Sequence, residues 1–401
     1  MKSIKIVDAR MGRGKTTAAI RYMNERKGTH RFLYVTPYLT EVDRICDCCG
    51  FIQPDYDVMS KSTSLKILMN QGRSIAFTHA LFAIIDQETL DIAHEKGYSL
   101  IIDESIDLIE NIHISAHDFN IVTKQLTERD EDGWLTWNEA DYTGCFSRYK
   151  ALADAGRLAL LDHSLISIVS PEVFRCFDEV IMMTYLFNGQ YQRAYLQYFE
   201  IPYHIVGIET DQSGPKFSTK PDRPHPLDLK DMIQIVNNPK MNAIGNSRTA
   251  LSKAWYTKRG RNNEDMAALR KHMYNYFQKV TGHTQEFRIW TCFKNDKDKL
   301  IPTSGRFRHN YLPMNVRATN DYRQATDVAY LVNRFCDPNL VKFFATKGFT
   351  IDHGEFALAE MLQFIWRSAI RDNKPINLYI PSKRMRQLLI DWIDQVSQGG
   401  T

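Results

Sequence analysis

Short apolar runs alternate with amphipathic stretches through the first half of the chain. The runs are bounded by polar turns, which is typical of buried strands. The predicted strands are Ile4–Val7, Arg31–Thr36, Ser74–Phe77, Leu100–Ile102, Glu179–Met183 and Tyr203–Ile208. Between them, apolar residues recur at helical spacing, as in Thr16–Arg26 and Tyr38–Cys46. This alternation predicts a parallel sheet with helices on its faces.

The second half resumes the pattern after a polar interruption. Residues 210–226 are rich in Pro, Ser, Gly and charge and are predicted to form a linker. Beyond it we predict a basic helical region at Arg248–Val280, a strand at Phe287–Thr291, helices near Asp327–Phe335 and Phe356–Ile370, a strand at Ile376–Ile380 and a terminal helix. The pattern therefore predicts an α/β chain in which this linker separates two domains, at 1–209 and 227–401.

Composition and charge narrow the class of protein. The chain has 401 residues, of which 43% are hydrophobic, so it can bury sizeable cores. No apolar run reaches the ~18 residues of a membrane span, and the first strand begins at once, so we expect a cytoplasmic protein that does not bind membranes. Residues 1–214 carry 21 Lys and Arg against 30 Asp and Glu, whereas residues 215–401 carry 30 against 17. The basic second half favours a polyanion as partner.

The first strand leads into a glycine-rich turn with the sequence A-R-M-G-R-G-K-T-T. Gly12 and Gly14 lack a Cβ, so backbone N–H groups can surround phosphate oxygens where a helix begins. Lys15 would reach the β- and γ-phosphates and Thr16 would bind Mg²⁺. The residues expected to contact ATP are Ala9, Gly12, Arg13, Gly14, Lys15, Thr16, Thr17 and Asp103. This pattern predicts a phosphate-binding loop.

A second apolar strand ends in the adjacent acids Asp103 and Glu104. A carboxylate at the end of a buried strand beside a phosphate loop can hold Mg²⁺, and the next one can activate the attacking water. We expect Asp103 to bind the metal together with Thr16, and Glu104 to act as the general base. Together the two motifs predict hydrolysis of a nucleoside triphosphate.

Near the C-terminus, Gln363, Arg367 and Arg371 are spaced four residues apart. On one helix this spacing would place all three side chains along one face. Such a row can present a guanidinium to the γ-phosphate as an arginine finger. Either Arg367 or Arg371 fits that role, and a basic helix packed on its sheet is the alternative.

These motifs resemble those of superfamily-2 DNA helicases. The sequences R-A-T-N-D-Y and Q-F-I-W-R-S-A-I-R most resemble helicase-like proteins of phages and mobile elements, which are distantly similar to viral origin-binding helicases. Ala9 replaces the usual first Gly of the loop, and Trp366 replaces the Gly of the Q-x-x-G-R-x-x-R motif. The resemblance implies two RecA-like domains in tandem, with ATP in the cleft between them.

The resemblance also implies residues that contact nucleic acid. Strand ends and loops match the backbone-contacting motifs at Thr36, Pro37, Thr78, Lys294, Arg317, Thr319 and Asn320. Thr184 matches a motif that couples hydrolysis to domain movement. We expect these contacts to fix the strand without reading its sequence.

About 80 residues separate Asp103 from Thr184, so we expect a mainly helical insertion at about 110–170. Its aromatic residues, including Trp134, Trp137 and Tyr142, form either a subdomain core or a stacking surface for bases.

The sequence thus predicts an ATP- and Mg²⁺-dependent helicase or translocase on single-stranded or forked DNA, active in phage replication or recombination with replication proteins as further partners. Two alternatives stay open. The first is an origin-binding or loading protein switched by ATP without unwinding, and the second is a viral packaging-type NTPase.

Overall fold

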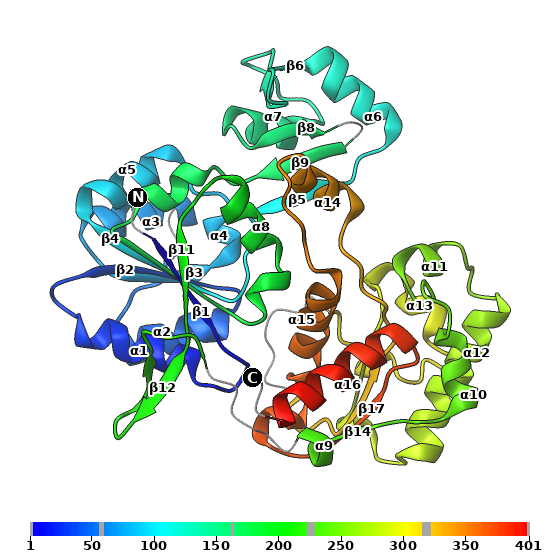
Figure 1. The fold of residues 1–401 in the computed structure, drawn as a ribbon. Coiled ribbons are helices and arrows are strands. Elements are labelled where there is room, and N and C mark those ends of the chain that lie inside the picture. The colour runs from blue at the N-terminus through cyan, green and yellow to red at the C-terminus, as the bar shows by residue number, and fades with distance from the viewer. Residues whose placement is uncertain (1–2, 56–59, 162–163, 223–228, 315–321, 399–401) are drawn as a thin grey trace. The chain divides into compact units, whose positions relative to one another are not determined.

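The computed structural model describes residues 3–55, 60–161, 164–222, 229–314 and 322–398. The chain divides into two compact units (Figure 1). The first unit comprises the residues up to Asp222 together with Cys336–Ile351, and the remaining residues belong to the second unit. Each unit is built around its own parallel sheet, which confirms the predicted α/β fold with two parallel-sheet domains in tandem.

The first unit contains a six-stranded sheet in the order β11-β1-β10-β4-β2-β3. Every neighbouring pair is parallel. Its strands are β1 (Ile4–Asp8), β2 (Arg31–Thr36), β3 (Ile75–Thr78), β4 (Tyr98–Asp103), β10 (Glu179–Thr184) and β11 (Tyr203–Val206). All six coincide with the strands predicted from apolar runs. Such runs mark strands buried on both faces, and Leu100, Ile101 and Ile102 of β4 are fully buried.

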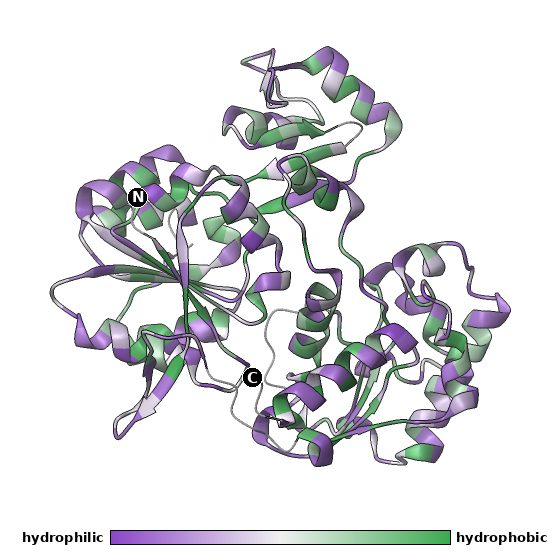
Figure 2. Cartoon of the chain, in the orientation of Figure 1, coloured by the Kyte–Doolittle hydropathy of each residue, from purple (hydrophilic) through white to green (hydrophobic). Residues whose placement is uncertain are grey.

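Amphipathic helices accompany this sheet, with hydrophilic and hydrophobic residues mixed along each ribbon (Figure 2). They are α1 (Lys15–Glu25), α2 (Leu39–Cys49), α3 (Lys61–Asn70), α4 (His79–Phe82), α5 (Gln87–Lys96) and α8 (Tyr191–Tyr198), with short 3₁₀ segments at η2 (Pro171–Cys176) and η3 (Phe187–Gly189). Ala18, Ala19 and Met23 of α1 pack into the core, where Val7 and Ile181 of the sheet are also buried. Small residues on α1 let the helix approach the sheet closely.

The predicted linker begins with an ordered hairpin, so the linker prediction is wrong for its first part. Strands β12 (Ile208–Asp211) and β13 (Gly214–Phe217) pair antiparallel and pack on α1. Arg21 of α1 pairs with Asp211, and the ring of Tyr22 lies 5.4 Å from that of Phe217. A Ser-Gly turn between two short strands explains the composition that suggested a linker. Residues 223–226 of the predicted linker lie outside the described residues.

The insertion is a mixed α+β subdomain, so the prediction that it is mainly helical is wrong. It holds a three-stranded antiparallel sheet, β5-β9-β8, and the hairpin β6-β7. Its elements are β5 (Ile109–Ile112), α6 (Ala116–Ile121), the π-helix η1 (Val122–Leu126), β6 (Thr127–Arg129), β7 (Leu135–Trp137), α7 (Ser147–Asp154), β8 (Leu158–Leu161) and β9 (Ser164–Ile168). Short strands of three to five residues give little periodic signal.

The aromatic residues of the insertion form its core rather than an open stacking surface. Trp137 is buried, its ring lies 5.2 Å from that of Tyr142, and the two pack with Phe146, Tyr149 and Leu165 in one cluster. This arrangement favours the structural reading of the aromatic spacing over the strand-separating wedge.

The boundary predicted at residue 227 misses a returning segment. Helix α14 (Pro338–Ala345) packs in the first unit against α8 and β5. The ring of Phe343 stacks on Tyr198 at 4.5 Å, and the Asp337 N–H donates to the Tyr191 hydroxyl at 2.6 Å. The aromatic residues of α14 thus complete the core of the first unit.

The second unit has a four-stranded parallel sheet in the order β14-β17-β16-β15. Its strands are β14 (Ile233–Ile235), β15 (Arg288–Thr291), β16 (Asp327–Tyr330) and β17 (Ile376–Tyr379). The helix predicted near Asp327–Phe335 is therefore wrong. Residues 327–330 are buried on both faces, and a short apolar run in that setting reads equally as strand or helix.

Helices surround this sheet in the second unit. They are α9 (Leu229–Met232), α10 (Pro239–Asn242), α11 (Lys253–Thr257), α12 (Glu264–Asn275), α13 (Lys297–Leu300), α15 (His353–Ile365) and α16 (Lys383–Ser397). Shorter helical segments are η4 (Ala243–Gly245), the π-helix η5 (Tyr276–Val280), η6 (Gln285–Phe287), η7 (Lys294–Asp296), η8 (Arg308–Asn310) and η10 (Ala369–Asp372). None of the helices in the described ranges combines the length and the apolar character needed to cross a membrane.

Candidate functional site

The glycine-rich turn joins β1 to α1 and has the backbone of a phosphate-binding loop. Gly12 and Gly14 have φ angles of 81° and 84°, in the left-handed region that glycine adopts without strain. Helix α1 starts immediately after Gly14, so its first N–H groups open onto the turn. A helix N-terminus preceded by such a turn is suited to binding anions.

Lys15 lies folded back under this loop. Its Nζ donates to the carbonyl oxygens of Ala9 at 2.5 Å and Arg10 at 3.4 Å. Burial lowers the pKa of Lys15, while the nearby charges of Glu104, Asp103 and Asp8 act in the opposite direction. The amine is therefore held beside the loop by weak carbonyl acceptors that a phosphate oxygen can replace.

Asp103 lies at the end of β4 and is 6% exposed. Its Oδ2 accepts hydrogen bonds from the Tyr34 hydroxyl at 2.7 Å and from Thr16 Oγ1 at 3.2 Å. Burial raises the pKa of Asp103, and the hydrogen bond from Tyr34 opposes that shift. Because β10 separates β1 from β4 in the sheet, the carboxylate faces the start of α1 across a single strand.

The residues present fit a nucleoside triphosphate with Mg²⁺. Open space surrounds the Cα of Gly12, so phosphates can approach the backbone there. Lys15 offers a half-buried cation, and the hydroxyl of Thr16 and the carboxylate of Asp103 meet as a pair of oxygen ligands of the kind Mg²⁺ prefers.

Glu104 follows Asp103 in an unusual backbone conformation. Its φ angle is 66°, which a residue with a side chain adopts at a cost of about 1–3 kcal/mol. The residue is half-buried, and its charge is the largest of those that oppose the lowering of the Lys15 pKa. Glu104 is therefore close enough to the phosphate loop for its charge to act on Lys15.

Thr184, predicted to couple hydrolysis to movement, belongs to a polar network that sequence analysis missed. Its Oγ1 and the side chain of Gln190 are hydrogen-bonded at 2.7 Å, and Ser105 Oγ donates to Gln190 Oε1 at 2.9 Å. The Thr184 carbonyl oxygen also accepts the Ala9 N–H at 3.1 Å. The network therefore connects the residue after Glu104 with the first residue of the phosphate loop.

Arg13 points away from the centre of the loop. Its Nη2 lies 3.3 Å from both the Ile208 carbonyl oxygen and Asp222 Oδ1. A Cβ added to Gly14 would lie 2.7 Å from Pro215 Cγ, so the β12–β13 hairpin rests directly on the loop. Thr17 is exposed on the first turn of α1. Arg13 and Thr17 therefore lie at the rim of the site, unlike Lys15 and Thr16.

Two further residues near the site were not predicted. Asp8 Oδ2 accepts the Phe187 N–H at 3.2 Å, and burial raises the pKa of Asp8. His79 Nε2 lies 2.9 Å from the Asp103 carbonyl oxygen. Asp8 and His79 are polar residues at the end of an apolar run, and Tyr34 lies within one. A polar residue that interrupts an apolar run was the signal in the sequence that could have identified them.

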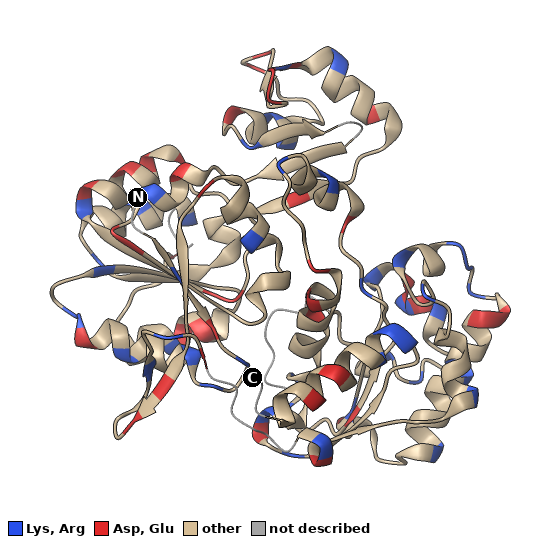
Figure 3. Cartoon of the chain, in the orientation of Figure 1, with Lys and Arg blue, Asp and Glu red and all other residues tan. Residues whose placement is uncertain are grey.

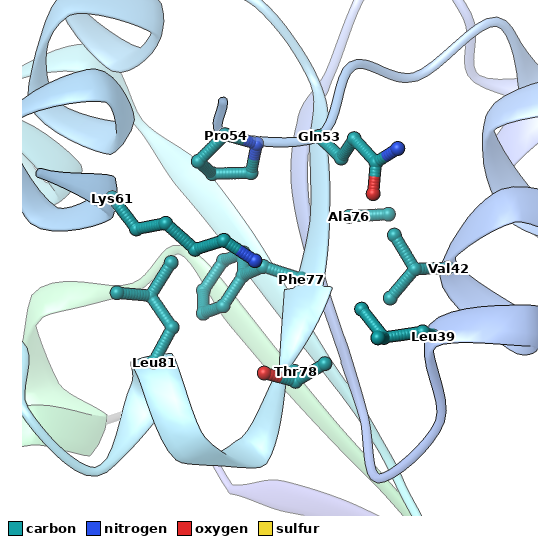
Figure 4. Close-up of a pocket in the computed structure, with 9 residues that line it drawn as sticks. All are labelled: Leu39, Val42, Gln53, Pro54, Lys61, Ala76, Phe77, Thr78 and Leu81. Atoms are coloured by element: carbon teal, nitrogen blue, oxygen red, sulfur yellow. The ribbon is translucent and has the colours of Figure 1, made fainter. Parts of the chain in front are cut away.

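The expected nucleic-acid contacts of the first unit differ in exposure. Thr36 is fully buried, whereas Pro37 and Thr78 are half-buried. Thr78 also lines a small pocket with Leu39, Gln53, Lys61 and Phe77 (Figure 4). Pro37 and Thr78 are therefore better placed than Thr36 for contact with a ligand.

In the second unit, Lys294 is exposed in η7, just after β15. The other predicted contacts, Arg317, Thr319 and Asn320, lie outside the described residues.

The predicted row of Gln363, Arg367 and Arg371 on one helix is wrong. Helix α15 ends at Ile365, so only Gln363 lies on it, and Arg371 lies in η10. Arg367 is half-buried, and its Nη1 donates to the Met314 carbonyl oxygen at 2.8 Å, while Arg371 is exposed. The prediction assumed that the helix continued past Trp366, where the chain turns instead.

The chain matches a known family domain in its second half and a relative over its whole length. Residues 227–393 match the YonV C-terminal Rossmann-like domain. The whole chain is 33% identical over 414 residues to the "SPbeta prophage-derived uncharacterized protein YonV" of Bacillus subtilis (strain 168), covering 98% of this chain and 99% of the relative. The chain belongs to the YonV family. The alignment with this relative spans both units of the chain.

Three solved structures contain chains that are similar to this one. S. tokodaii Xpd4 has a TM-score of 0.45 at 12% identity, covering 97% of this chain and 94% of that one. S. cerevisiae Dbp5 bound to RNA and ADP BeF3 has a TM-score of 0.36 at 12% identity, covering 100% and 84%. The DUF1998 helicase MrfA has a TM-score of 0.34 at 13% identity, covering 98% and 49%.

Proposed function

We propose that this YonV-family protein hydrolyses ATP and uses the reaction to move along nucleic acid as a translocase or helicase. The observation that carries the proposal is the meeting of Thr16 Oγ1 and Tyr34 at the buried carboxylate of Asp103, beside Lys15 and the two left-handed glycines. A phosphate loop, a hydroxyl and a strand-end carboxylate in this relation are the parts that Mg²⁺-dependent hydrolysis of a nucleoside triphosphate needs.

ATP and Mg²⁺, when bound, would supply the phosphoanhydride bond and neutralise its charge. Lys15 and the loop N–H groups would bind the phosphates, and Thr16 and Asp103 would hold the metal. Glu104 would accept the proton of the attacking water on its carboxylate. Gln363 and either Arg367 or Arg371 would stabilise the developing charge from the second unit, since a guanidinium beside the transferred group accelerates phosphoryl transfer.

The coupling to nucleic acid rests on the polar network around Thr184. This network touches both the residue after Glu104 and the start of the phosphate loop, so a change at the nucleotide alters strand ends of the same sheet. Pro37 and Thr78 lie at such strand ends, and Lys294, Arg317, Thr319 and Asn320 complete the proposed contacts. The prophage origin of the YonV relative supports a role on phage DNA.

Steady-state ATP hydrolysis with and without single-stranded DNA or RNA tests the proposal. We expect Lys15→Ala and Glu104→Gln each to abolish nucleic-acid-stimulated hydrolysis, with unchanged circular dichroism and unfolding midpoint. Near-normal turnover in either variant would exclude the assignment. Unwinding of forks with opposite overhangs then separates a helicase from a translocase.

The alternative of an ATP-switched origin-binding or loading protein makes a different prediction in the same assays. Such a protein would bind DNA more tightly with ATP but hydrolyse it negligibly, whatever DNA is added. A packaging-type NTPase would hydrolyse ATP and require duplex DNA for stimulation.

A further inference from the structure

The positive charge of the second half is concentrated in one helical region. Residues 248–309 contain 14 Lys and Arg against 5 Asp and Glu, a net charge of +9, whereas all of 215–401 carries +13. Helix α11 contains Lys253, and α12 contains Arg270 and Lys271; Lys and Arg are drawn in blue in Figure 3. A positive charge of this size within one segment is larger than solubility alone requires, so we expect a negatively charged partner that it could bind.

Several of these cations stabilise the fold and are not available to a partner. Arg259 pairs with Asp265 at 2.7 Å, and Arg270 donates to the Lys299 carbonyl oxygen at 2.6 Å. Arg288 is buried and donates to the His283 carbonyl oxygen. Lys271, Arg306 and Arg308 are different, since they are exposed and form no ion pair with any residue in the described ranges.

An exposed aromatic ring lies beside two of these cations, Lys271 and Arg306. Tyr274 is 37% exposed, although most aromatic residues of α12 and η5 are fully buried. The guanidinium of Arg306 lies over its ring at 5.5 Å, and the ring of Phe307 supports it edge-on at 6.4 Å. Lys271 precedes Tyr274 by three residues on α12, so both lie on one helix face. We call Lys271, Tyr274, Arg306 and Arg308 the Tyr274 surface.

The Tyr274 surface lies toward the amino-terminal edge of the sheet of the second unit. The end of α12 and the residues after it are fixed there, because the Tyr276 hydroxyl donates to the Asn377 carbonyl oxygen at 2.7 Å and His283 lies 3.0 Å from Asp327 Oδ1, at the first residue of β16. Lys294 follows the carboxyl end of β15, at the opposite edge. The Tyr274 surface is therefore separate from the strand-end contacts proposed above.

We propose that the Tyr274 surface is a second binding site for single-stranded nucleic acid. The exposed ring and the guanidinium stack on a base, and Lys271 and Arg308 contact the flanking phosphates. Ring stacking requires an unpaired base, which favours a single strand over a duplex or an acidic protein. This second site rests on the proposed function for its ligand, nucleic acid, but it lies at the other edge of the sheet of the second unit.

Fluorescence anisotropy with labelled oligothymidine and oligouridine, without nucleotide, tests the site in the full-length protein. We expect Tyr274→Ala to weaken binding about tenfold, since stacking on one base contributes ~1–3 kcal/mol. Tyr274→Phe should keep the affinity. Arg306→Ala should also reduce the salt dependence, by about 0.7 in the slope of log K against log salt. Lys253→Ala, an exposed cation of the same region on α11, is the charge-matched control.

Equal affinity of Tyr274→Ala and wild type, an equal loss in Lys253→Ala, or tighter binding of a labelled duplex would each overturn the inference. These results are independent of the proposed function. If Lys15→Ala abolishes hydrolysis while Tyr274→Ala binds normally, only the second site fails. If the wild type does not hydrolyse ATP but Tyr274→Ala loses affinity, the hydrolytic function fails and the Tyr274 surface stands.

Discussion

The hydroxyl of Tyr34 donates a hydrogen bond to Oδ2 of Asp103 at 2.7 Å, from between the buried apolar residues Leu33 and Val35. The two residues come from neighbouring parallel strands, β2 and β4. Because burial raises the pKa of Asp103, this donor helps to keep the carboxylate ionised where a metal would need it. Tyr34 is therefore a positioning residue for the proposed Mg²⁺ site.

Replacing Tyr34 with Phe removes the donor and keeps the ring. We expect the Mg²⁺ concentration for half-maximal hydrolysis to rise by about 10-fold, the usual effect of losing a partner of a metal ligand. Hydrolysis measured across a Mg²⁺ titration checks this. Tyr98→Phe is the matched control, since Tyr98 is buried in β4 but donates to the Arg73 carbonyl oxygen. An unchanged Mg²⁺ requirement in Tyr34→Phe would contradict the role.

The two loop glycines should respond differently to Ala. Both have positive φ angles, so each substitution costs about 1–2 kcal/mol in backbone conformation. At Gly14 the added Cβ would also lie 2.7 Å from Pro215 Cγ, whereas at Gly12 it meets open space. We expect Gly14→Ala to lose more unfolding free energy than Gly12→Ala, measured by urea denaturation.

The hairpin contact can be isolated with a double variant. Pro215→Ala removes Cγ, the atom closest to the added Cβ. The double variant should therefore lose less unfolding free energy than the sum of the two single variants. Additive effects of the two substitutions would show that the hairpin does not press on the loop.

Most strands of the first sheet could be predicted because they are buried on both faces and read as continuous apolar runs. The same property made β16 ambiguous, since a short apolar run has no period that separates strand from helix. The β12–β13 hairpin and helix α14 were missed for another reason. Their placement depends on contacts with residues far away in sequence, such as Arg21 with Asp211 and Phe343 with Tyr198.

The candidate site divides in the same way. Gly12, Lys15, Thr16, Asp103 and Glu104 belong to local motifs whose chemistry fixes residue type and spacing. Two of their supporting partners, Tyr34 and Gln190, are contributed by other segments of the chain, and no local spacing marks them. The arginine row failed because a helix end at Ile365 cannot be read from a spacing of four residues alone.

Thr184→Val should separate hydrolysis from its stimulation. The substitution keeps the shape of the side chain and removes the hydroxyl that is bonded to Gln190, which is buried. We expect basal hydrolysis to persist and stimulation by single-stranded DNA to fall several-fold. The Gln190 amide keeps its bonds to Ser105 and to the Tyr185 carbonyl oxygen, so the loss of one buried hydrogen bond should lower the unfolding free energy by only about 0.5–1.5 kcal/mol. Thr184→Ser retains the hydroxyl and should behave as wild type, and full stimulation in Thr184→Val would exclude the coupling role.

The two arginines that could act as the arginine finger should differ in how much their replacement by Ala lowers the unfolding free energy. Arg367 donates to the Met314 and Pro313 carbonyl oxygens, so Arg367→Ala should lower the unfolding free energy by about 1–3 kcal/mol. Arg371 is exposed, so Arg371→Ala should change it by less than about 0.5 kcal/mol. We expect Arg371→Ala to lower kcat nonetheless, and Arg371→Lys to restore little of it because Lys lacks the planar fork. Normal kcat in Arg371→Ala would assign the finger to Arg367.

Asp8→Asn should stabilise the nucleotide-free protein at neutral pH. Burial is the largest influence on Asp8 and raises its pKa, so the folded state holds the proton more tightly than the unfolded state. Stability from this group is fully present below the unfolded pKa and is lost as pH rises through the folded pKa. Asn lacks the desolvated charge and can still accept the Phe187 N–H through its amide oxygen.

Urea denaturation across a pH series measures this effect. The advantage of Asp8→Asn should be largest at neutral pH and shrink on acidification, as the wild-type carboxyl takes up its proton. Asp43→Asn, at an exposed position on α2, is the matched control. An advantage that grows toward acid would mean that the charge of Asp8 stabilises the loop through Lys15 by more than its desolvation costs.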